Sequence, residues 1–145
     1  MNTAAETSAN ILGALGQGLP TLLLHFGVVI ALLIAGILVY MAVTPFHERQ
    51  LLRSGNAAAA TVLGGALVAL SIPLAALLAT TGALLDILVW GLVAVILQLV
   101  TVMVVLLLLR GMRTMIESGQ VAAAIPLVAA QLSIGLLNAA AMVPV

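Results

Sequence analysis

Four long apolar stretches constrain this chain more than any other feature of its sequence. They cover residues 19–43, 57–80, 87–109 and 121–143. Each reaches or exceeds the roughly 20 residues that an α-helix needs to cross about 30 Å of hydrocarbon. Backbone polar groups left unpaired in lipid are costly, so such stretches become helices, and they lack the alternation that a membrane β-barrel requires. We therefore predict an all-α membrane protein with four transmembrane helices.

Composition supports this fold class and excludes several functions. The chain is 65% hydrophobic and 6% charged, whereas soluble domains are about 45–50% apolar. Its net charge is zero, so no basic field exists for a nucleic-acid partner. There is no cysteine, and the two histidines fall on opposite sides of the predicted membrane, so we expect no metal and no cofactor. We expect no enzyme, because no nucleophile–base pair or carboxylate pair shares a depth.

Charged residues gather in two of the three connections between the apolar stretches. Those in the first and third connections are Glu48, Arg49, Arg53, Arg110, Arg113 and Glu117. All four arginines of the chain therefore lie on one side, which the positive-inside rule assigns to the cytoplasm. Both termini are then non-cytoplasmic. These residues are candidate contacts for a cytoplasmic protein partner, and Glu48 is expected to reach Arg49 or Arg53 across one helical turn.

Residues at the predicted span ends have assignable roles. Tyr40 and Phe46 near the cytoplasmic boundary, and Trp90 near the outer one, are predicted to anchor the spans among the lipid headgroups. Asn56 is predicted to cap the second long helix and Asp86 the third.

An internal repeat organises the chain. A shift of 64 positions lays Ser54 and Gly55 on Ser118 and Gly119, and it lays Arg49 on Arg113. This match predicts two tandem helical hairpins, residues 19–80 and 81–145, after an N-terminal lead-in at residues 1–18. Each unit has two spans, so both copies enter the membrane in the same direction. The repeat is therefore parallel rather than inverted.

Small residues recur at helical spacing in the first two stretches. They are Gly27, Ala31 and Ala35 in the first, and Thr61, Gly65 and Ala69 in the second. Such ridges let helix backbones approach closely in lipid. They predict helix packing and self-association into a homo-oligomer.

Four polar side chains inside the stretches are the remaining candidate site. Gln98 and Gln131 are predicted at a similar depth near the midplane, with His25 and Asn138 nearer the outside. This intramembrane polar seam has two interpretations: the amides join helices by hydrogen bonds, or they line a wet path. No Asp or Glu lies inside a span, which argues against a proton-coupled carrier.

Several short motifs resemble one family of membrane proteins. They are Thr44-Pro45, Glu48, Gly55-Asn56, Leu63-Gly64-Gly65, Ser71-Ile72-Pro73, Asp86, Trp90, Gln98 and Asn138-Ala139-Ala140. Together they resemble the bacterial inner-membrane family known as domain of unknown function 350, over nearly the whole chain after residue 20. The resemblance implies a four-helix protein of the bacterial inner membrane, built from two copies of a hairpin, with no established activity.

Two function classes follow from these observations. The first is a structural or adaptor component that lies in membrane lipid, self-associates and presents its cytoplasmic loops to a partner. The alternative is a small channel or facilitator whose polar seam centres on Gln98 and Gln131.

Overall fold

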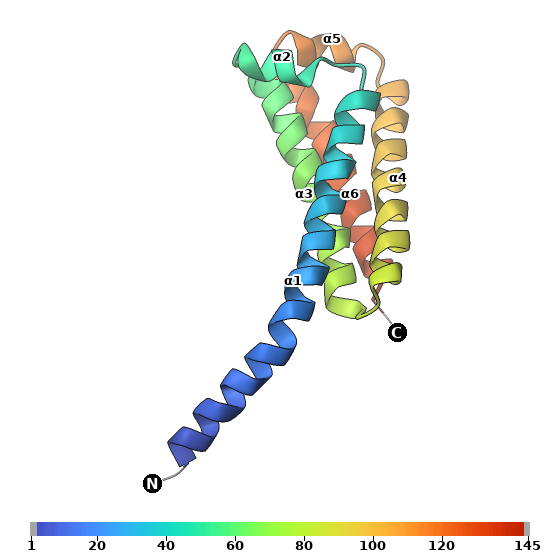
Figure 1. Cartoon of the computed structure of the whole chain (residues 1–145). Coiled ribbons are helices and arrows are strands. Elements are labelled where there is room, and N and C mark those ends of the chain that lie inside the picture. The colour runs from blue at the N-terminus through green and yellow to red at the C-terminus, as the bar shows by residue number, and fades with distance from the viewer. Residues whose placement is uncertain (1–2, 144–145) are drawn as a thin grey trace.

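Four long helices and two short ones make up the described part of the chain. The computed structural model describes residues 3–143, and its helices are α1 (Thr3–Val43), α2 (Glu48–Arg53), α3 (Ala57–Thr80), α4 (Leu84–Leu108), α5 (Met112–Glu117) and α6 (Val121–Ala141) (Figure 1). Each long helix contains a segment long and apolar enough to cross a membrane. A helix satisfies its backbone hydrogen bonds internally, as lipid requires. The prediction of an all-helical protein with four spans is confirmed.

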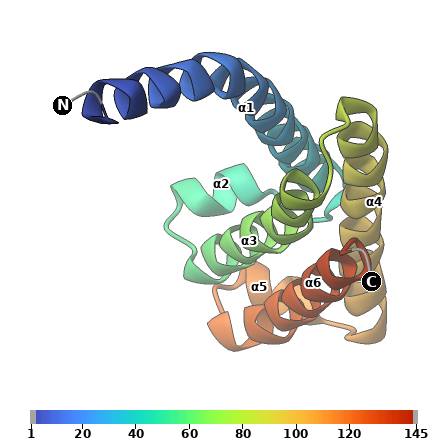
Figure 2. The same cartoon turned by 90° about the horizontal axis from the view of Figure 1, so that it is seen from below.

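The beginning of α1 differs from the sequence-based expectation. No boundary separates a lead-in from the first span, because one helix of 41 residues runs from Thr3 to Val43. At 1.5 Å per residue it is about 60 Å long, roughly twice the hydrocarbon thickness. Its first part leaves the other helices and turns away from them (Figures 1 and 2). Pro20 lies inside this helix and offers no N–H to the carbonyl four residues earlier, so α1 lacks one backbone hydrogen bond there.

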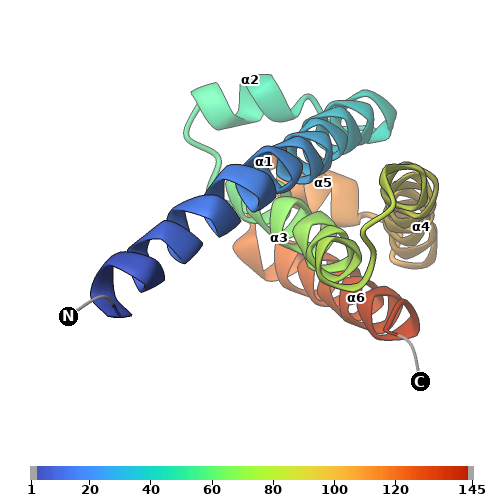
Figure 3. The ribbon, with the colours of Figure 1, turned by 60° about the horizontal axis from the view of Figure 1, so that its bottom comes forward.

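The helix α3 lies at the centre of the bundle. Figures 2 and 3 show it between α1 and α6, with α4 alongside, and α3 packs against all three. Nine of its residues are buried, including Ala58, Ala66 and Ala69. Lipid tails give no hydrophobic drive for association, so close backbone approach at small residues stabilises such contacts.

Glycines mark the tightest helix contacts. A Cβ atom added to Gly65 of α3 would lie 2.5 Å from Val128 of α6, and one added to Gly91 of α4 would lie 2.7 Å from Leu32 of α1. Such distances are shorter than any real van der Waals contact. A larger residue at 65 would therefore force Val128 and its helix to shift, whereas at 91 the Leu32 side chain would have to change its rotamer.

The two short helices have matching local geometry. Both α2 and α5 contain six residues and lie at the same end of the bundle (Figure 1). Each is followed by a glycine with positive φ, 76° at Gly55 and 86° at Gly119, a conformation that other residues rarely adopt. Asn56 then caps α3 by accepting from the Ala59 N–H at 2.9 Å, and its amide nitrogen donates to the Ile116 carbonyl at 2.9 Å. Asn56 thus joins the two connections.

Some predicted roles at the helix ends are wrong. Asp86 does not cap α4, because the helix begins at Leu84 after Ala83, and Asp86 instead accepts from the Thr81 hydroxyl at 3.2 Å. Tyr40 and Phe46 are buried rather than exposed to headgroups, whereas Trp90 is half exposed. Tyr40 and Phe46 belong to the hydrophobic cluster that closes the α2–α5 end of the bundle.

Candidate functional site: a buried polar column

Gln98 of α4 joins three helices through its side-chain amide. It is 2% exposed, and its Nε2 donates to the Ala69 carbonyl of α3 and the Gln131 carbonyl of α6, both at 3.1 Å. Pro73 lies four residues after Ala69 within α3. Because proline has no N–H, the Ala69 carbonyl loses its usual helix donor. Gln98 supplies that donor from a neighbouring helix, as lipid-embedded backbone requires.

Gly135 makes room for this arrangement. A Cβ atom at residue 135 would lie 2.6 Å from the Ala69 carbonyl oxygen and 3.0 Å from the Gln98 Nε2. The residue is buried between α6 and α3. The Ala69 carbonyl, the Gln98 amide that donates to it and Gly135 therefore lie together where α3, α4 and α6 meet.

Gln131 lies at the same level but uses its side chain differently. It is fully buried, yet its side-chain amide makes no well-aligned hydrogen bond among the described residues and approaches only the Tyr40 hydroxyl. The Gln98 Oε1 and the Tyr40 hydroxyl are likewise buried without such a hydrogen bond. Tyr40 lies beside the Gln131 amide, within electrostatic range of Glu48. Buried polar atoms without a well-aligned hydrogen-bond partner in the described chain thus extend from Gln131 to Tyr40, toward the α2–α5 end.

At that end the polar groups finish in a buried carboxyl. The Thr44 hydroxyl is 2.8 Å from the Tyr40 carbonyl and also hydrogen-bonds the Glu48 carboxyl. Glu48 is 3% exposed. We call Gln98, Gln131, Tyr40, Thr44 and Glu48 the polar column.

Glu48 is suited to the neutral acid form. Burial raises the pKa of its carboxyl, an effect that the Thr44 hydrogen bond and nearby His47 partly offset. Thr44 has one hydroxyl proton for two acceptors, the Tyr40 carbonyl and the Glu48 carboxylate. A protonated Glu48 donates the second proton itself, and both contacts are then satisfied.

The expectation that Glu48 pairs with Arg49 or Arg53 as an exposed loop contact is therefore wrong. Its side chain turns into the bundle to meet Thr44. In residues 3–143 the ion pair that forms is instead Arg113 with Glu117, at 2.9 Å. The exposed arginines at this end are Arg49, Arg53, Arg110 and Arg113.

The pH dependence of α2 docking tests the assignment of Glu48. A folded-state pKa above the unfolded one favours the folded state at low pH, and this contribution is lost as pH rises through the raised pKa. In detergent micelles, trypsin cleavage after Arg49 and Arg53, relative to Arg110 and Arg113, should therefore rise with pH, by up to about tenfold per pH unit. Glu48→Gln should abolish this rise. An equal rise in cleavage in the wild type and in Glu48→Gln would contradict the assignment of Glu48 as the titrating group.

The other predicted polar residues do not join the column. His25 of α1 is half-buried and lines a surface pocket of about 600 Å³ with Thr21, Phe26 and Leu78. Asn138 of α6 is half-buried, with an amide nitrogen that has no partner among the described residues. In the part of the chain that the structure describes, no hydrogen bond joins His25 to Asn138. The structure thus brings together only Gln98 and Gln131 of the four.

The two small-residue ridges lie in different surroundings. Gly65 and Ala69 of α3 face α6, and Thr61 is half-buried beside them. On α1 the ridge of Gly27, Ala31 and Ala35 is exposed along its length. Gly36, the neighbour of Ala35 on α1, faces the bundle instead, because a Cβ atom added there would lie 3.0 Å from Val95. The first ridge therefore faces away from the bundle.

Tyr40, Thr44 and Pro73 were not recognised as site residues from the sequence. Tyr40 and Thr44 are one helical turn apart at the end of α1. The chain then leaves the helix at residues 44–47 and brings Glu48, the first residue of α2, back to Thr44. Pro73 identifies the carbonyl of residue 69 as one that needs another donor. Both features can be read from the sequence, but neither identifies the distant side chain that forms the hydrogen bond.

The fold and the column together define a multi-pass helical membrane protein with polar groups enclosed between its helices. A family model described as Domain of Unknown Function (DUF350) matches residues 14–142, and the chain belongs to this family. The resemblance noted from the sequence motifs is confirmed.

Two relatives support the cellular location. The chain is 30% identical over 118 residues to the UPF0719 inner membrane protein YjfL of Escherichia coli strain K12, covering 81% of this chain and 89% of the relative. The protein of the same name from Escherichia coli O157:H7 matches equally well. With four membrane-length apolar helices, this similarity supports a multi-pass protein of the inner membrane. No solved structure matches the chain significantly.

Proposed function

We propose that this protein is a structural, non-enzymatic component of the bacterial inner membrane that self-associates through α1. The observation that carries the proposal is the enclosed Gln98 amide, which binds two neighbouring helices rather than facing a lumen. Amides used in this way fasten helices together. We therefore propose that the centre of one chain holds its helices together and does not form an open path.

The surface of α1 supports self-association. Only 11% of its most apolar segment is buried within the chain, against 39% for α3. Its exposed ridge of Gly27, Ala31 and Ala35 is suited to close contact with the same ridge on a second copy. A twofold axis along the membrane normal pairs like residues with one another.

We also propose that the chain is a tandem repeat of two parallel hairpins and that its α2–α5 end faces the cytoplasm. The matching lengths of α2 and α5 and the positive φ of Gly55 and Gly119 favour the repeat. Four exposed arginines favour the orientation. In this orientation, Arg49, Arg53 and Arg110 are available to a cytoplasmic partner.

Cysteine crosslinking tests self-association directly, because the natural chain has no cysteine. Ala31→Cys should form a disulfide-linked dimer in native membranes under mild oxidation, since the ridge brings residue 31 next to its copy. Val100→Cys is the matched control, because Val100 is also exposed but lies on α4. Dimers at both positions, or at neither, would contradict the proposal.

One observation favours a second function. The unpartnered polar atoms of Gln131, Gln98 and Tyr40 have the hydrogen-bonding capacity to accommodate water or a small uncharged polar solute. We therefore keep a facilitator as the second candidate. Its test is flux into liposomes, which Gln131→Leu should abolish if Gln131 lines the path.

A further inference from the structure

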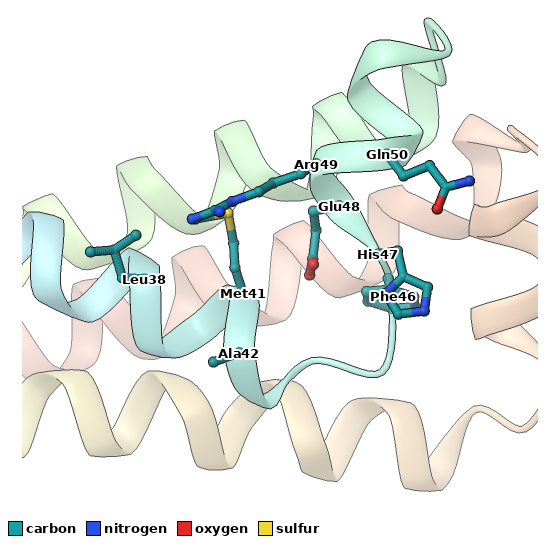
Figure 4. Close-up of a pocket in the computed structure, with 8 residues that line it drawn as sticks. All are labelled: Leu38, Met41, Ala42, Phe46, His47, Glu48, Arg49 and Gln50. Atoms are coloured by element: carbon teal, nitrogen blue, oxygen red, sulfur yellow. The ribbon is translucent and has the colours of Figure 1, made fainter.

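A groove of about 480 Å³ lies between the end of α1 and the short helix α2. Figure 4 shows its walls: Leu38, Met41 and Ala42 come from the last turns of α1, and Arg49 and Gln50 come from α2. Phe46, His47 and Glu48 complete the lining, so one wall is apolar and the other is polar, with both the Arg49 guanidinium and the Glu48 carboxyl on it.

Arg49 is free to bind an anion in this groove. Its neighbour Glu48 also lines the groove, but the Glu48 carboxyl hydrogen-bonds the Thr44 hydroxyl rather than the guanidinium. In Figure 4 the Arg49 side chain extends away from Glu48, toward Met41 and Leu38. No ion pair of Arg49 occurs within residues 3–143. A guanidinium binds phosphate through two parallel hydrogen bonds.

The depth of the groove fits a phospholipid. The first span ends at Val43, so Leu38 to Ala42 occupy its last turn, where hydrocarbon gives way to headgroups. Arg49 and Gln50 lie just beyond that boundary, on the exposed side of α2. An acyl chain along α1 would place its phosphate beside Arg49.

We propose that this groove binds one anionic phospholipid, with Arg49 on its phosphate and Leu38, Met41 and Ala42 along an acyl chain. The site differs from diffuse attraction to a charged surface, because it depends on one arginine out of the four exposed ones. It also places the lipid against the segment that holds Glu48. The proposal does not depend on self-association or flux.

Native mass spectrometry of the full chain tests the site with added dioleoyl phosphatidylglycerol or phosphatidylcholine. The protein should retain phosphatidylglycerol at least fivefold better, and Arg49→Gln should lower that retention about fivefold. Arg53→Gln is the matched control, because it removes the same charge from the same helix outside the groove lining. It should leave retention unchanged.

Further outcomes decide against the site. Equal losses in Arg49→Gln and Arg53→Gln would show diffuse electrostatics, and equal retention of the two lipids would show no headgroup selection. Displacement of the lipid by millimolar glycerol 3-phosphate would show an anion site without an acyl component. If Arg49→Gln unfolds, Arg49→Lys serves instead, because it keeps the charge and loses the two-pronged geometry. That variant should lose about half of the retention.

Discussion

Replacing Gly135 with alanine should lower the free energy of unfolding by about 3 kcal/mol. The added Cβ would lie 2.6 Å from the Ala69 carbonyl oxygen and 3.0 Å from the Gln98 Nε2. Because one neighbour is backbone, α3 and α6 must separate to relieve the contact. Separation also weakens the Gln98 hydrogen bonds. Unfolding by sodium dodecyl sulfate in mixed micelles, followed by the fluorescence of Trp90, measures the change.

Gly64→Ala is the matched control for this prediction. It makes the same change in α3, but a Cβ atom at residue 64 meets nothing within 4 Å. Its effect should be within about 0.5 kcal/mol of zero. If Gly135→Ala proves as mild as Gly64→Ala, the close approach of α3 and α6 at residue 135 is incorrect.

Replacing the two buried glutamines with leucine should change stability in opposite directions. Gln98→Leu removes the donor to the Ala69 and Gln131 carbonyls and should cost about 1–2 kcal/mol. Gln131→Leu removes two buried polar atoms that have no partner in the described chain and should stabilise by about 1 kcal/mol. The same unfolding titration measures both variants.

The role of Pro73 supplies an internal control. Pro73→Ala restores an N–H four residues after Ala69, so the helix satisfies that carbonyl itself. Combined with this change, Gln98→Leu should cost less than it does alone, and a double-mutant cycle measures the difference. Strict additivity would mean that Gln98 does not replace the missing helix donor.

Gln131 also separates the two candidate functions. Stabilisation by Gln131→Leu with unaltered liposome permeability favours the closed structural support. Destabilisation together with loss of flux favours the facilitator, because the amide then serves a hydrated path. The physical distinction is whether a partner from outside the chain satisfies the amide atoms.

Glu48 belongs both to the buried polar column and to the lining of the proposed lipid groove. The column finishes in a carboxyl that the bundle encloses and that hydrogen-bonds the Thr44 hydroxyl rather than Arg49. A change in Glu48 ionisation would therefore alter both α2 docking and the charge around the groove. The lipid-binding test at low and high pH should consequently differ in wild type more than in Glu48→Gln.

The sequence alone determined the class of this protein. Uninterrupted apolar length leaves a helix as the only way to satisfy backbone hydrogen bonds in lipid, so the four spans were predictable. Asn56 was also predictable as a cap, because its side chain acts on its own backbone neighbours. Such features depend on residues close together in the chain.

Only the tertiary structure decided which distant groups meet. The sequence placed Gln98 and Gln131 at one depth, but helix rotation decided that the Gln98 amide reaches the carbonyl freed by Pro73. Rotation likewise turned Glu48 inward, against the expected arginine pair, and turned the Gly27 ridge outward. In lipid, both faces of a helix are apolar, so hydrophobic periodicity does not specify rotation. Packing at Gly65, Gly91 and Gly135 specifies it instead.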